Sequence, residues 1–139
     1  MLRLADVIGA YDESFRVWKY VTLLSDPEYS SVKVGVELKD TLTKLSFTYS
    51  SDVVRVIQAC MASDLGVQSA INIACYEMVT LLEFLVMTKE FCGSQKKIDV
   101  VEQNTYCIKF LPSVDCGPIN ISKAAKMINF KPTPLVSSH

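Results

Sequence analysis

Glycine and histidine are scarce in this 139-residue sequence, and their scarcity excludes several classes of chemistry. The five glycines lie far apart, so the chain can build neither a GxGxxG dinucleotide-binding loop nor a P-loop. The single histidine is the last residue, His139, which leaves a Ser/His/Asp or Cys/His device without a base. No two potential metal ligands stand beside a second pair. We therefore predict no catalytic, cofactor-binding or metal-binding residues in this chain.

The cysteine pattern excludes two further kinds of site. There are five cysteines, an odd number, and they are widely spaced with no CxxC among them. Neither a disulfide framework nor a zinc site fits this pattern. We expect reduced thiols that are mostly buried.

Long apolar runs and basic clusters are also missing. No run approaches the roughly 20 apolar residues of a membrane helix, and Asp6 interrupts the N-terminal stretch where a signal peptide is apolar. The net charge is -1, and the lysines are scattered. The sequence thus predicts a cytoplasmic protein with no nucleic-acid and no membrane partner, and residues 1–139 are expected to form one unit.

The hydrophobic pattern predicts both strands and helices. Residues 2–8 are expected to form a buried strand that ends at Gly9, and strict alternation predicts strands over 32–38 and 43–49. Shorter strand candidates are 70–74, 98–101 and 106–110.

Four helices are predicted between these strands. They are expected to run from Ser14 to Asp26, from a Ser50 or Ser51 cap to Gly66, from Thr80 to Gly93, and from Ser122 to Asn129. Thr80 and Glu83 form a capping-box pattern. Trp18 is expected in the core, as is the stripe Val53, Val56, Ile57, Cys60 and Met61. Together the elements indicate a mixed α and β fold.

The stretch YSSVK places Tyr29 and Lys33 four residues apart, a spacing that would pair a phenol with an ammonium on a helix. Here the stretch follows a proline and enters a predicted strand. Residues four apart on a strand are separated by roughly 13 Å, which is too far for the lysine to tune the phenol. The pair is therefore predicted not to be catalytic.

Four stretches in succession resemble motifs of one enzyme family. LRLADVIGAYD is similar to LRxxNVYGPxD, FTYSSDVVRVI to FxYVDDVVRAI, INIACYEMVTLLEF to YNIGSGExVTLLEL, and ISKAAKMINFKPTPL to DxSKAKxxLGFxPxT. Their order over residues 2–135 resembles the C-terminal part of the extended short-chain dehydrogenase/reductases, the NAD-dependent epimerase/dehydratase family.

The resemblance implies an α/β fold that is the substrate-binding portion of a Rossmann-type enzyme, without the N-terminal dinucleotide-binding half. Complete members use NAD or NADP on a sugar nucleotide or similar alcohol. This chain alone is expected neither to bind that cofactor nor to be active. Two alternatives stay open. One is a steroid or lipid-alcohol dehydrogenase-type member, and the other is a non-catalytic fragment that pairs with a full-length relative or with itself.

Three residues are candidates for substrate binding: Asp6 and Tyr49 from the family-like motifs, and Arg16 from its place in the first predicted helix. Asp6 matches a position that faces the substrate cleft, although capping of the following loop is an equal alternative. Arg16, placed in the first predicted helix, could meet a diphosphate, or it could lie on a solvated helix face. Tyr49 stands at the second signature as core or cleft lining, beside Asp52, which is expected to be a helix-start residue.

Several positions depart from the family pattern and weaken the roles that it implies. Leu45 stands where an arginine often reaches a substrate phosphate, so a bidentate contact is lost. The other departures are Asp6 for Asn, Ala10 for Pro, and Tyr76 and Asn129 for Gly.

Overall fold

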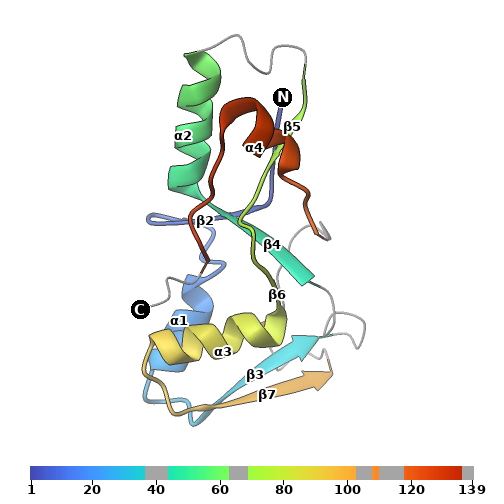
Figure 1. Ribbon diagram of the computed structural model, residues 1–139. Coiled ribbons are helices and arrows are strands. Elements are labelled where there is room, and N and C mark those ends of the chain that lie inside the picture. The colour runs from blue at the N-terminus through green and yellow to red at the C-terminus, as the bar shows by residue number, and fades with distance from the viewer. Residues whose placement is uncertain (37–43, 63–68, 103–107, 110–117, 136–139) are drawn as a thin grey trace. The chain divides into compact units, whose positions relative to one another are not determined.

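The computed structural model describes residues 1–36, 44–62, 69–102, 108–109 and 118–135 (Figure 1). These residues form a mixed α and β structure, which confirms the predicted fold class. They divide into two compact units, each assembled from separate stretches of the chain. The first unit comprises Met1–Asp12, Leu45–Met78 and Asp115–His139, and the second comprises Glu13–Lys44 and Val79–Val114.

The first unit holds two sets of parallel strands and two helices. Its elements are β1 (Leu2–Leu4), β2 (Asp6–Ile8), β4 (Lys44–Tyr49), β5 (Ile71–Ile73), α2 (Ser50–Met61) and α4 (Ser122–Ile128). β1 pairs with β5 and β2 pairs with β4, both in parallel. β6 (Met78–Thr80) is the third strand in the order β2-β4-β6, and through it the chain leaves this unit.

The prediction of one buried strand over residues 2–8 was wrong. The segment is two short strands separated at Ala5, because its first half follows β5 and its second half follows β4. β1 is also largely exposed, with Leu4 38% exposed.

The core of the first unit gathers around β5. Ile71 and Ile73 are almost fully buried, and Val56 of α2 and Ala124 of α4 belong to the same cluster. Part of the stripe predicted for α2 was wrong, because Ile57 and Met61 are 43% and 82% exposed. Successive helical residues turn by about 100°, which places these two on the side away from Val56.

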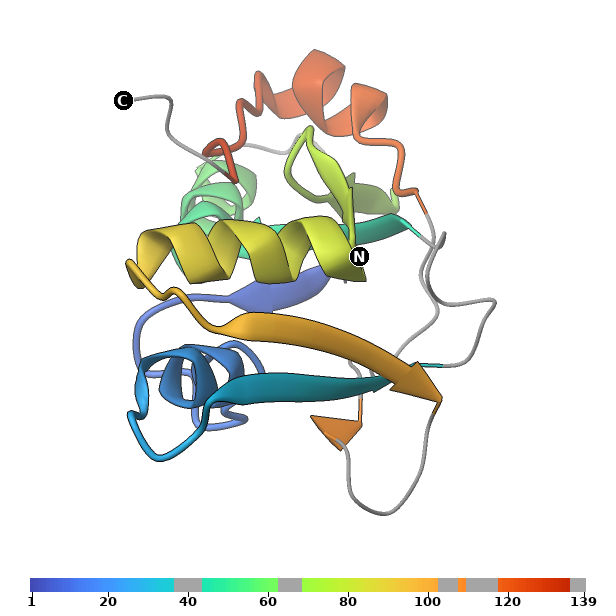
Figure 2. The ribbon, with the colours of Figure 1, turned by 90° about the horizontal axis from the view of Figure 1, so that it is seen from below.

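The second unit pairs two helices with a parallel sheet. Figure 2 shows its longest strands side by side, and their order is β7-β3-β8. The elements are α1 (Trp18–Ser25), β3 (Ser31–Val36), α3 (Leu81–Phe91), β7 (Lys97–Glu102) and β8 (Ile108–Lys109). The rings of Tyr20 and Phe84 meet edge to face with centroids 6.0 Å apart, which joins α1 to α3.

The first helix starts later than the sequence predicted. Phe15 has a φ of 53°, so the backbone is left-handed there and α1 begins only at Trp18. Trp18 is 50% exposed rather than in the core, and Tyr20 is the aromatic residue buried from this helix. Tyr29 precedes β3 and Lys33 lies on it, so no helix unites the YSSVK pair.

Most of the predicted helix ends are confirmed. The Thr80 hydroxyl accepts from the Glu83 N–H at 3.3 Å, and the Glu83 carboxylate accepts from the Thr80 N–H at 2.7 Å. Gly93 follows α3 with a φ of 62°, and Asn129 follows α4 in the left-handed conformation. A left-handed residue after the last turn is a common way to end a helix.

The predicted serine cap of α2 was wrong. Tyr49 is the N-cap residue, with an extended backbone and no side-chain cap, because β4 runs directly into the helix. Ser50 and Ser51 therefore already lie inside α2. The predicted end at Gly66 lies outside the described residues, as do Tyr106, Cys107 and Phe110 of the last strand candidate.

Candidate functional site

Two of the predicted site residues, Asp6 and Tyr49, lie on neighbouring parallel strands of the first unit. β2 and β4 pair so that Asp6 is level with Phe47, and Ile8 with Tyr49. Residues two apart on a strand point to the same face, so Asp6 and Tyr49 share one face of this sheet. Both residues are half-buried. The structure thus brings them onto one surface, and their contact with a substrate stays a prediction.

The Tyr49 hydroxyl is held by the C-terminal segment. It donates a hydrogen bond to the carbonyl oxygen of Leu135 at 3.1 Å. Burial raises the pKa of Tyr49, and the nearby Cys75, Glu77 and Asp52 raise it further. The phenol therefore keeps its proton at neutral pH and acts as a donor rather than a base.

Asp52 is the most deeply buried charged residue of this region. Its carboxylate accepts hydrogen bonds from the Thr133 N–H at 2.7 Å and the Thr133 hydroxyl at 2.8 Å, and it pairs with Arg55. Burial alone would raise the pKa of Asp52, but the hydrogen bonds from Arg55 and Thr133 outweigh burial and lower it. Asp52 lies in the first turn of α2, as predicted, and it also ties α2 to the C-terminal segment.

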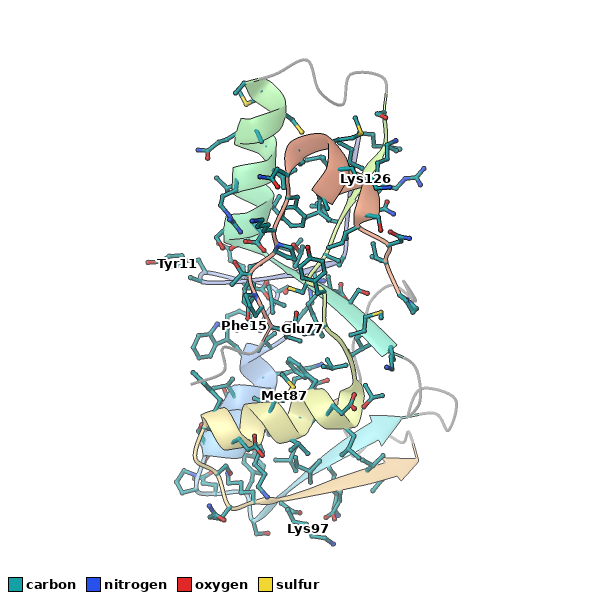
Figure 3. All side chains as sticks on the ribbon, viewed as in Figure 1. Tyr11, Phe15, Glu77, Met87, Lys97 and Lys126 are labelled. Carbon is teal, nitrogen blue, oxygen red and sulfur yellow. The ribbon has the colours of Figure 1, made fainter. Side chains whose placement is uncertain are left out.

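The same C-terminal segment has further attachments to the first unit. The Arg55 guanidinium donates to the carbonyl oxygen of Lys131 at 3.2 Å. The carboxylate of Glu77, which is labelled in Figure 3, accepts from the Leu135 N–H at 3.3 Å. We use the name tail clamp for Tyr49, Asp52, Arg55 and Glu77 with residues 131–135. Sequence reasoning missed the clamp because its partners lie 58 to 86 positions apart, and no local spacing marks such a contact.

Cys75 is a buried thiol beside this region. Its N–H donates to the Phe47 carbonyl oxygen at 2.6 Å, and the residue is buried. Burial, with Glu77 and Asp52, raises the pKa of Cys75 to about 12. A thiol with so high a pKa is not ionised at neutral pH. Cys60 and Cys92 are also free but only half-buried, so the prediction of mostly buried thiols was wrong for these two, while Cys107 and Cys116 lie outside the described part.

The third predicted site residue, Arg16, belongs to the second unit. Its Nε donates to the Ser14 hydroxyl at 2.9 Å. Arg16 lies in the turn before α1 and not in the helix, so its predicted place in a helix was wrong. The left-handed backbone at Phe15 delays the start of α1 to Trp18. The neighbouring Lys19 is in α1, where its ammonium lies 4.8 Å from the centre of the Tyr20 ring.

Gly9 is placed so closely against the start of α2 that a larger residue cannot fit. A Cβ atom at this position would lie 2.1 Å from Ser50 Oγ and 3.0 Å from Ser50 Cβ. We expect Gly9→Ala to lower the free energy of unfolding by about 1–3 kcal/mol, as other overpacked substitutions do. Urea denaturation of the purified chain measures this difference.

The control for Gly9→Ala is the double variant Gly9→Ala/Ser50→Gly. Removal of the Ser50 side chain deletes both clashing atoms, so most of the lost stability should return. Equal destabilisation in the single and double variants would show that the contact with Ser50 is not the cause.

The described residues contain no group of three or more His, Cys, Asp or Glu side chains that could hold a metal ion. Within the same residues, no helix is long and apolar enough to cross a membrane.

Comparison with known proteins identifies the fold. No protein-family model matches the chain, and no curated protein sequence matches it significantly. Solved structures are similar, however. The UDP-glucuronic acid 4-epimerase from Bacillus cereus, in complex with UDP-glucuronic acid and NAD, is 22% identical with a TM-score of 0.65, over 98% of this chain and 40% of that one.

Two further structures give the same result. The UDP-glucose 4-epimerase from Thermotoga maritima, with UDP-glucose, is 18% identical with a TM-score of 0.65, over 94% of this chain and 40% of that one. RMD from Pseudomonas aeruginosa, complexed with NADPH, is 12% identical with a TM-score of 0.67, over 95% of this chain and 41% of that one. Nearly the whole chain thus has the same fold as a part of these Rossmann-like epimerase structures. The chain spans about 40% of their length.

Proposed function

We propose that this chain is the substrate-binding portion of an NAD(P)-dependent epimerase/dehydratase or related oxidoreductase that acts on a sugar nucleotide. One observation carries the proposal: 98% of the chain matches the fold of an epimerase solved with a nucleotide sugar and NAD, although the chain spans only 40% of it. The succession of four family-like motifs points the same way. We expect the chain to be inactive alone, because it has no glycine-rich loop to hold a dinucleotide.

The residues proposed to bind substrate are the three candidates from the sequence, Asp6, Arg16 and Tyr49. Asp6 and Tyr49 share a face of the β2-β4 sheet in the first unit, and Arg16 precedes α1 in the second. An arginine fork suits a diphosphate, and a carboxylate suits sugar hydroxyls. NAD or NADP would be held by polypeptide that contributes a glycine-rich loop, because this chain has none.

Calorimetric titration of the chain with UDP-glucuronic acid and UDP-glucose tests the proposal. We expect binding that Arg16→Ala weakens by about tenfold or more, since a charge-assisted hydrogen bond contributes about 1.5–3 kcal/mol. Arg3→Ala is the matched control, because Arg3 is exposed on β1 outside the predicted site. No heat of binding for either nucleotide sugar would reject the proposed substrate class. Reduction of NAD by the chain alone would reject the view that it is incomplete.

A further inference from the structure

Thr133 links the solvent-exposed side of the C-terminal segment to a buried charge. Thr133 and Pro134 are exposed, whereas Pro132 before them is buried. The Thr133 hydroxyl nevertheless donates to the Asp52 carboxylate at 2.8 Å, and the Asp52 side chain is 0% exposed. A chemical change at this hydroxyl would therefore act directly on the buried carboxylate of the tail clamp.

The backbone around Thr133 has the form that a protein kinase accepts. Residues 129–134 form neither helix nor strand. Pro132 and Pro134 fix φ near −65°, and a residue that precedes a proline favours an extended conformation. Serine/threonine kinases bind their acceptor in an extended segment, and the proline-directed kinases require a proline directly after it. Of the five prolines in the sequence, only Pro134 follows a serine or threonine.

A phosphate on Thr133 would oppose the contacts that hold the segment. The hydroxyl would lose the proton that it donates to Asp52, and a group with a charge of about −1.5 to −2 would stand beside a buried carboxylate. Such repulsion is strong where water screens little. Asp52 would keep the Thr133 N–H but lose the hydroxyl as a donor.

Arg55 does not offset this repulsion. Its guanidinium pairs with Asp52 and lies 3.5 Å from the Thr133 hydroxyl oxygen. Because the Arg55 side chain is 56% exposed, it can follow a phosphate into solvent. Each contact that Arg55 gains with the phosphate is then taken from Asp52, whose buried charge loses a partner.

We propose that Thr133 is a phosphorylation site and that the charge of its phosphate releases residues 131–135 from the tail clamp. A serine/threonine kinase transfers the phosphoryl group of ATP. The Thr133 oxygen bonds to the γ-phosphorus, the bond from that phosphorus to its bridging oxygen breaks, ADP leaves, and the hydroxyl proton passes to a base of the kinase. The kinase reaches the hydroxyl during local opening of the segment. The proposal is independent of the proposed function, because it involves no sugar nucleotide.

Treatment of the purified chain with a proline-directed kinase and Mg-ATP tests the site. Mass spectrometry should locate phosphate on Thr133 of the wild type, and the same position of Thr133→Val should take none. A synthetic peptide of residues 126–139 is the control for the kinase. Phosphate on the peptide but not on the chain would overturn the proposal, because the tail clamp would then keep the hydroxyl inaccessible. No phosphate on either would reject this kinase class and the proposal with it.

Hydrogen exchange of the phosphorylated chain tests the release. The Thr133 amide donates to Asp52 and the Leu135 amide to Glu77, so both report on the tail clamp. We expect both amides to exchange at least about tenfold faster after phosphorylation, because the phosphate favours the open segment. Unchanged or slower exchange would overturn the proposal, since it would mean that Arg55 holds the phosphate and closes the tail clamp.

Asp52→Asn separates the charge of the phosphate from the loss of a hydrogen bond. The variant keeps an acceptor of similar shape but no negative charge. Phosphorylation should therefore accelerate exchange of the Leu135 amide much less in Asp52→Asn than in the wild type, and the difference is the coupling between the two charges. Equal acceleration in the two proteins would contradict release by charge.

Discussion

Asp52→Ala should be among the most destabilising single substitutions in this chain, with a loss of about 3–5 kcal/mol in the free energy of unfolding. The carboxylate is fully buried and accepts two hydrogen bonds from Thr133, at 2.7 and 2.8 Å. Hydrogen bonds to a charged group contribute about 1.5–3 kcal/mol each, and their removal leaves the Thr133 donors without that acceptor. Chemical denaturation followed by circular dichroism measures the loss.

A variant of Arg55 distinguishes the contribution of the ion pair from that of the hydrogen bonds between Asp52 and Thr133. Arg55→Gln should cost much less than Asp52→Ala, because the Arg55 side chain is 56% exposed and exposed charges contribute little. Asp99→Asn is the matched carboxylate control, because Asp99 pairs with the exposed Lys97 at 2.9 Å. The free energy of unfolding of this variant should equal that of the wild type within error. If Asp52→Ala and Asp99→Asn had equal effects, the tail clamp would contribute nothing to stability.

The Asp52 clamp also has a defined dependence on pH. Because its pKa is lowered in the folded chain, the unfolded chain binds the proton more tightly. The stabilisation is therefore fully present above the ordinary aspartate pKa of about 3.9 and is lost as the pH falls through the lower folded value. Asp52→Asn, which does not titrate, should lose less stability than the wild type over that interval.

Ile73→Ala should lower the free energy of unfolding by about 2–5 kcal/mol. Ile73 is 0% exposed in β5 and belongs to the core cluster of the first unit with Val56 and Ala124. The substitution leaves a cavity in a site closed by two helices, and large-to-small changes at such sites cost this much. Thermal and urea unfolding measure the effect.

Ile57→Ala is the matched control, because the same atoms are removed from a residue that is 43% exposed on α2. Its effect should stay within about 0.5 kcal/mol, as for other surface changes. A loss at Ile57 as large as that at Ile73 would mean that the outer side of α2 is covered in solution, contrary to the structure.

Much of the local structure could be predicted from the sequence. The Thr80 and Glu83 capping box, the left-handed Asn129 and the strands β3, β4 and β5 are where the pattern indicated. The cap and the left-handed residue depend on neighbours within a few residues, and the strands were marked by their local alternation of apolar and polar residues. The errors arose where distant residues decide, as at the division of residues 2–8 between two partner strands.

In the candidate site, too, the sequence predicted local features but not contacts between distant residues. The sequence singled out Asp6 and Tyr49 through motifs and Arg16 through its place in a predicted helix, and the pairing of β2 with β4 placed Asp6 and Tyr49 on one face. Arg16 was assigned to a helix because its spacing is helical, but the positive φ of Phe15 delays the helix. The tail clamp could not be found from spacing at all.

Residue types and near neighbours are enough to show that this chain has no glycine-rich loop and no histidine before its last residue, and that a capped helix starts at Thr80. The pairing of β1 with β5 and of β2 with β4, and the attachment of Asp52 to the C-terminal segment, depend on the tertiary structure. These contacts join residues 41 to 81 positions apart. They form only when distant backbone and carboxylate groups meet in space, which no local pattern encodes.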